Sequence, residues 1–67
     1  MVLCIDGDGR LYVADFNAKV VVVLDATSGT ELARAAVPGY ARGVAVTRSG
    51  TIMVSHDGPN GIALIDS

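Results

Sequence analysis

The sequence predicts an all-β fold in which antiparallel strands form two successive units, the first with four strands and the second with three. Three observations lead to this prediction. Short runs of Val, Ile and Leu are separated by clusters of Gly, Asp, Asn, Ser and Pro, which is typical of strands joined by tight turns. A segment with strand composition also recurs after a fixed number of residues. Finally, 51% of the 67 residues are hydrophobic and 18% are charged, which indicates a folded chain.

The first unit, residues 1–41, contains four segments with strand composition. Asp8-Gly9 separates the first two and suits a tight hairpin, because Gly accepts a positive φ. Asn17-Ala18-Lys19 forms the next loop, and Ala26–Thr30 forms the turn before the last segment. We expect the strands at 3–5, 11–14, 21–25 and 31–37.

The fourth segment is ambiguous when read in isolation. Glu31-Leu32-Ala33-Arg34-Ala35-Ala36 consists of residues with good helix propensity. Pro38-Gly39 ends the segment after seven residues, which is short for a helix. The repeat described next also requires a strand at this place. We therefore predict a strand.

The second unit, residues 42–67, repeats the first. Gly50 lies 41 positions after Gly9, and this offset aligns every apolar segment without a gap. Val13 then matches Val54, and Asp25 matches Asp66. The matched segments of the second unit are 44–46, 52–55 and 62–66, and no fourth segment follows them.

A period of about 40–45 residues is that of a four-stranded propeller blade. The stretch Gly9–Asn17, GRLYVADFN, resembles the signature of NHL-type propeller repeats. Tyr40–Val46, followed by Ser49-Gly50 and Ile62–Asp66, resembles the YVTN-type repeat. The chain departs from these patterns at Ala41, Ser49, Met53 and His56. The resemblance implies an antiparallel β-propeller of which this chain holds about one and two-thirds blades.

The resemblance also implies where a ligand would bind. In such propellers the loops after the second and fourth strands of each blade share one rim, which commonly carries the ligand site. We expect ligand contacts from Asp15, Tyr40, Arg42 and His56. Three further residues are expected on the same rim, namely Asn17, Asp57 and Asn60. We expect a binding scaffold for an unidentified protein or small molecule.

Two alternative functions stay open. Some relatives are metal-dependent hydrolases, such as lactonases, or lyases, and Asp15 beside His56 on the next blade could hold a metal or move a proton. The simpler, structural interpretation is that an Asp in a loop, such as Asp15, caps its own turn and that His56 is an exposed, solvated side chain. No G-x-S-x-G or phosphate-binding Gly motif occurs, so we favour a non-enzymatic role without a cofactor. The second alternative is a purely structural repeat that self-associates.

Composition limits the partners. The formal net charge is −2, and the five basic residues are scattered, so we expect no nucleic-acid partner. The longest apolar run, Val20–Leu24, is too short to span a membrane, and Met1–Ile5 does not form a signal peptide. Relatives are often periplasmic or extracellular, but the sequence leaves localisation open.

A unit of this kind cannot cover both its faces alone. Further blades are therefore expected, either in a longer chain or from copies in a homo-oligomer.

Asp25 and Asp66 each end the third segment of a unit. An Asp at this place typically caps the following turn through its own carboxylate. Their recurrence in both units favours this structural role over a catalytic one.

Overall fold

The computed structural model describes residues 2–5 as backbone and residues 8–66 in full. This part of the chain consists of β-strands and their connections, and it contains no helix long and apolar enough to cross a membrane. The strands are β1 (Val2–Ile5), β2 (Arg10–Asp15), β3 (Val20–Asp25), β4 (Glu31–Ala36), β5 (Tyr40–Val46), β6 (Thr51–Asp57) and β7 (Gly61–Asp66).

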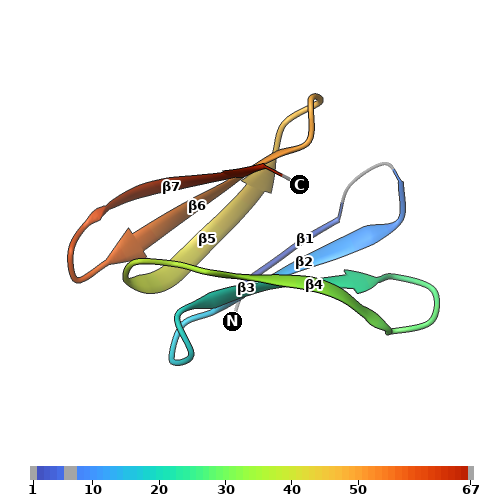
Figure 1. The fold of residues 1–67 in the computed structure, drawn as a ribbon, viewed down its shortest axis with the longest axis horizontal. Coiled ribbons are helices and arrows are strands. Elements are labelled where there is room, and N and C mark those ends of the chain that lie inside the picture. The colour runs from blue at the N-terminus through green and yellow to red at the C-terminus, as the bar shows by residue number, and fades with distance from the viewer. Residues whose placement is uncertain (1, 6–7, 67) are drawn as a thin grey trace.

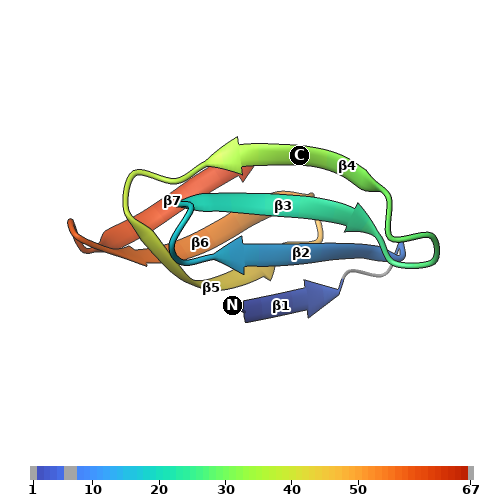
Figure 2. The same ribbon diagram turned by 90° about the horizontal axis from the view of Figure 1, so that it is seen from below.

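These strands form two antiparallel sheets that lie face to face (Figure 1). The first sheet has the order β1-β2-β3-β4, and the second has the order β5-β6-β7. Figure 2 shows the first sheet in front of the second, with β4 and β7 along the same side of the molecule. The predicted all-β, antiparallel character is confirmed. Within each sheet, every strand pairs with the next one along the chain, as short hairpin connections favour, whereas the connection from β4 to β5 passes between the sheets.

The two predicted Gly turns occupy equivalent places in the sheets. Gly9 precedes β2 with φ +78°, and Gly50 precedes β6 with φ +92°. Both angles lie in the left-handed region, which Gly adopts without the steric cost that a Cβ imposes. Asp6 and Gly7 lie outside the described residues.

The ambiguous fourth segment is a strand, as predicted. β4 pairs with β3 along its length, for example Val20 with Ala36 and Val21 with Ala35. The backbone ladder to β3 therefore outweighs the local helix propensity of Glu31–Ala36, because propensity is a weak preference that tertiary pairing overrides.

The core lies between the two sheets. The first sheet contributes Tyr12 and Ala14 from β2 and Val21 and Val23 from β3, at alternate positions as the pleat requires. The second sheet contributes Ile52 and Val54 from β6, and Val37 and Ala41 complete the buried cluster. Val44, Val46, Ala63 and Ile65 pack against it, half-buried.

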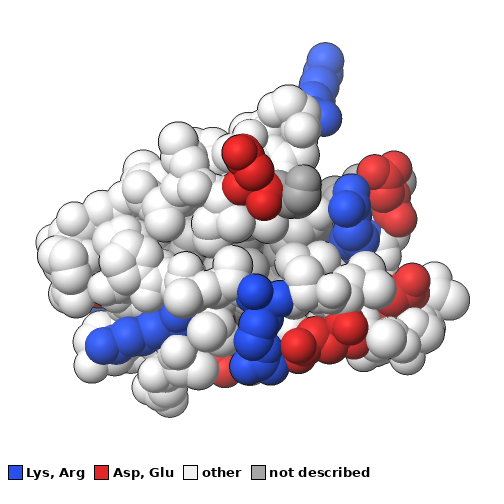
Figure 3. Space-filling model, viewed as in Figure 1, with Lys and Arg blue, Asp and Glu red and all other residues white. Residues whose placement is uncertain are grey.

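The outer face of the second sheet is also apolar, but it is open. Ile62 and Leu64 on β7 are 65% and 68% exposed, and Met53 on β6 is 37% exposed. Gly43, Val44, Ala45, Met53, Ser55 and Ile62 line a shallow groove on this face. Charged side chains of both signs are interspersed on the face shown in Figure 3 rather than gathered into one patch.

Candidate functional site

Three connections meet at one end of the molecule. They are the turn after β2, the segment from β4 to β5 and the turn after β6, all at the left of Figure 1. Both sheets therefore contribute to this end, and the four residues predicted to bind a ligand all lie on or beside these connections.

An aromatic pair joins the two sheets here. The Phe16 and Tyr40 rings stack with centroids 4.9 Å apart and planes 23° from parallel. The Lys19 ammonium lies 4.5 Å from the Tyr40 centroid, and the Arg42 guanidinium carbon lies 5.2 Å from the Phe16 centroid. Arg42 Nε donates a hydrogen bond to the Asp57 carboxylate. We call these five side chains the aromatic end cluster.

A β-bulge directs Arg42 to this cluster. Ala41 faces His56 and Gly43 faces Ser55 in the β5–β6 ladder, which leaves Arg42 as an extra residue without a cross-strand partner. Bulges of this kind change the direction of a side chain near functional sites. Here Ala41 points into the core, whereas Arg42 is 62% exposed.

Asp15 shapes the turn that carries Phe16 and Lys19. Its Oδ1 accepts a hydrogen bond from the Ala18 amide at 3.2 Å, and its carbonyl accepts one from the Lys19 amide at 3.1 Å. Lys19 has φ +57°, an uncommon angle for a residue with a side chain. Asp15 thus acts as a turn cap that positions its neighbours.

His56 is buried, not exposed and solvated as the structural interpretation of the sequence assumed. It is 7% exposed, and its Nδ1 lies 2.8 Å from the Pro59 carbonyl oxygen. Since a carbonyl only accepts hydrogen bonds, Nδ1 carries the proton. Gly39 and Gly61 approach the ring so closely that a Cβ on either would lie about 3 Å from it. His56 therefore contacts both the β4–β5 connection and the β6–β7 turn and holds them together next to the aromatic end cluster.

The structure brings two of the four predicted residues into one surface. Tyr40 and Arg42 both contact Phe16, whereas Asp15 and His56 each bond within their own turn. Within residues 8–66, no three His, Cys, Asp or Glu side chains gather closely enough to hold a metal. The residues that the sequence prediction missed are Phe16 and Lys19. Phe16 is the sole Phe of the chain and directly follows a strand, which was the available signal.

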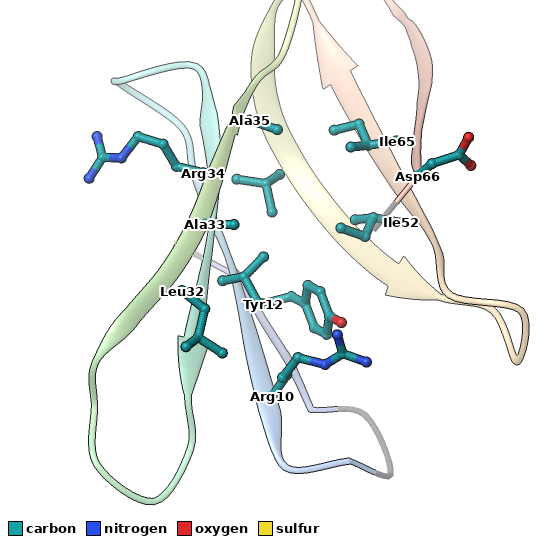
Figure 4. A pocket seen from close by; sticks show the side chains of 11 residues that line it. Arg10, Tyr12, Leu32, Ala33, Arg34, Ala35, Ile52, Ile65 and Asp66 are labelled. Atoms are coloured by element: carbon teal, nitrogen blue, oxygen red, sulfur yellow. The ribbon is translucent and has the colours of Figure 1, made fainter.

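A second feature lies between the sheets, along the side where β4 and β7 run. A cavity of about 350 Å³ opens there (Figure 4). Leu32, Ala33 and Ala35 line it from β4, and Ile65 lines it from β7. The side chains of Arg34 and Asp66 point away from it in Figure 4.

No protein-family model, curated protein or solved structure matches the chain.

Proposed function

We propose that the two sheets are consecutive propeller-type blades, and that the chain is a binding scaffold whose ligand surface is the aromatic end cluster. The blade proposal is supported by the shared strand order of the two sheets and by the 41-residue offset that relates them. In addition, β5 contacts β1 and β2, so the first strands of the two sheets lie together.

The offset also relates the faces of the sheets. The buried positions Tyr12, Val21 and Val23 of the first sheet correspond to Met53, Ile62 and Leu64, which are open on the second sheet. The same face of the repeating unit is thus buried in the first sheet, which the second sheet covers, and open in the second sheet, which no described sheet covers. Stacked repeats have this property, since each repeat buries its faces against its neighbours.

The observation that carries the binding proposal is the Phe16–Tyr40 stack between the cations of Lys19 and Arg42. Aromatic residues and Arg are enriched in protein-binding surfaces, where they provide large contact area. Asp57 neutralises one cation, and Lys19 adds a second positive charge beside the rings. The surface therefore suits a partner that presents an acidic group next to an apolar or aromatic one.

Selection from a random peptide phage library against the full chain tests this proposal. We expect enriched peptides to combine an aromatic residue with Asp or Glu. Their affinity, measured by calorimetry with synthetic peptides, should fall at least about tenfold for Tyr40→Ala, which corresponds to a loss of roughly 1.4 kcal/mol. Arg42→Ala should weaken binding in the same direction.

Arg48→Ala provides the matched control. Arg48 is an exposed residue of the β5–β6 turn, whereas the cluster lies at the opposite ends of these strands. Its replacement removes one positive charge without touching the aromatic stack. Equal affinity of the enriched peptides for the native chain and for Tyr40→Ala would refute the assignment of this surface.

A further inference from the structure

We propose that the terminal Nη atoms of Arg42 bind a carboxylate group of the binding partner, and that Asp57 holds Arg42 in position to do so. This inference rests on the proposed function, since it assigns the chemistry of the ligand at the aromatic end cluster. The observation that carries it is a guanidinium that the chain fixes in place, while its terminal donors make no hydrogen bond within the described residues.

Two contacts fix the Arg42 guanidinium. Its Nε donates a hydrogen bond to the Asp57 carboxylate, and its carbon atom lies 5.2 Å from the Phe16 ring centroid. Asp57 is itself placed by the sheet, because it pairs with Tyr40 at the end of the β5–β6 ladder. A side chain that is held in this way loses little conformational freedom when a ligand binds, which favours affinity.

The donors that remain belong to the Nη atoms. Within residues 8–66, the Arg42 side chain makes no hydrogen bond besides the one from its Nε. The guanidinium is planar, and its terminal nitrogens form a fork that matches the paired oxygens of a carboxylate. The side chain is largely exposed, so such a group can reach the fork from solvent.

Arg34 on β4 shows the opposite arrangement. Its Nε and its Nη2 both donate to the Glu31 carboxylate, at 3.2 and 2.8 Å. This guanidinium therefore already holds a bidentate carboxylate of the chain itself. Arg42 bonds its internal carboxylate through Nε alone, which leaves the fork for a carboxylate from another molecule.

The charge of the cluster favours a singly charged ligand. Lys19 and Arg42 are cationic and Asp57 is anionic, which leaves one net positive charge at the aromatic stack. An Arg fork also matches a phosphate, but a phosphate group carries about two negative charges. The Asp57 carboxylate on the same guanidinium repels a phosphate more strongly than it repels a carboxylate. Asp57 therefore affects specificity as well as position.

The probe is the synthetic peptide acetyl-Gly-Phe-Asp-Gly-amide, titrated into the ¹⁵N-labelled full chain at low ionic strength. We expect NMR shifts of the Arg42 Nε–H signal and of the backbone amides of Tyr40 and Asp57, but not of the Arg34 Nε–H signal. The control peptide acetyl-Gly-Phe-Asn-Gly-amide has the same ring and nearly the same shape without the charge. It should bind at least about tenfold more weakly, because hydrogen bonds to charged groups are stronger than neutral ones.

Two further peptides identify the source and the kind of the anion. Acetyl-Gly-Gly-Phe with a free C-terminal carboxylate presents the same group at a chain end, and binding of either acidic peptide at Arg42 supports the inference. The second peptide carries phosphoserine in place of Asp, and it should bind the native chain no more tightly than the Asp peptide does. This order should reverse in Asp57→Asn, which keeps an acceptor for Arg42 Nε but removes the negative charge.

Two protein variants with the same substitution test the fork. Arg42→Lys keeps the positive charge but removes the planar fork, so it should weaken the Asp peptide at least about tenfold. Arg34→Lys makes this change where a carboxylate of the chain already occupies the guanidinium, and it should leave the affinity unchanged. The native-like ¹⁵N spectrum of each variant is checked before the titration.

Four results would overturn the inference. The first is equal affinity for the Asp and Asn peptides, and if Tyr40→Ala weakens both alike, the proposed function still holds. The second is equal affinity of Arg42→Lys and the native chain for the Asp peptide. The third is tighter binding of the phosphoserine peptide by the native chain. The fourth is the absence of any shift at Arg42 with roughly 10 mM of either acidic peptide, a concentration that detects millimolar affinity. The phage selection tests the proposed function independently of these results.

Discussion

Gly39 occupies a place where no side chain fits. A Cβ at this position would lie 2.2 Å from the Asp57 carbonyl oxygen and 3.0 Å from His56 Nδ1. The first of these is backbone, so it cannot move aside at low cost. The connection between the sheets therefore passes directly over β6, and Gly is required by close approach.

We expect Gly39→Ala to lower the free energy of unfolding by about 2–3 kcal/mol, since the added methyl group forces backbone to shift. Urea denaturation followed by circular dichroism measures the change. Gly43→Ala is the control, because its Cβ would meet only the Ser55 hydroxyl oxygen, at 3.1 Å, and this side chain can rotate. Equal losses in the two variants would contradict the close-approach explanation.

At the residue scale, the sequence identified Tyr40 and Arg42 as surface residues, but it did not predict that His56 is buried. The sequence places His56 on the same side of β6 as Ile52 and Val54, since alternate residues share a face. Its burial depends on Gly39, which comes from the connection between the sheets. Contacts of this kind form between segments that are distant in the chain, so the local sequence contains no pattern that predicts them.

At the element scale, the bulge in β5 changes which residues face the core. Ala41 points inward, and after the extra residue the inward positions become Val44 and Val46. A regular strand would have continued inward at positions 43 and 45. The bulge therefore allows Arg42 to join the aromatic end cluster next to the inward Ala41, while Val44 and Val46 still pack against the core.

The turn between β3 and β4 is organised by Asp25, as predicted. Its Oδ1 accepts hydrogen bonds from the amides of Thr27, at 2.8 Å, and Ser28, at 3.0 Å. These donors, that of Ser28 first, lower the pKa of the Asp25 carboxyl below its ordinary value. The carboxylate form thus stabilises the turn that positions β4.

We expect Asp25→Asn to keep an acceptor for this turn but to lose the pH dependence. Because the pKa of Asp25 is lower in the folded state, its stabilising contribution is complete above the unfolded value of about 3.9. This contribution is lost as the pH falls through the folded value. The stability of the native chain relative to Asp25→Asn should therefore decrease below about pH 4. Urea denaturation between neutral and acidic pH measures this difference, and a constant difference would contradict the cap.

At the scale of the whole molecule, the apolar face of β6 and β7 is open to solvent in the part of the chain that the structure describes. Ile62 and Leu64 are each about two-thirds exposed, and Met53 lies beside them on the same face. Exposed contiguous apolar surface promotes association. This face corresponds by the 41-residue offset to the face of the first sheet that the second sheet covers.

We expect the purified chain to self-associate through this face, and Ile62→Glu with Leu64→Glu to reduce its average mass in light scattering. The two positions are exposed, so the stability of the monomer should change by no more than about 0.5 kcal/mol per site. Ala18→Glu with Asn60→Glu adds the same charge at exposed turn positions and serves as the control. An equal reduction of mass by both pairs would mean that charge, rather than this face, governs association.

The sequence by itself determined the strands, their order and the turns, because these follow from the alternation of apolar residues, from Gly and Asp at turn positions, and from a repeat in which three of the four segments of the first unit recur. It also predicted the turn-capping role of Asp25. The tertiary structure alone decided which face of each sheet is buried, that Arg42 occupies a bulge and that Phe16 stacks on Tyr40. These features depend on contacts between segments far apart in the chain, and both faces of these sheets are apolar, so local pattern could not distinguish them.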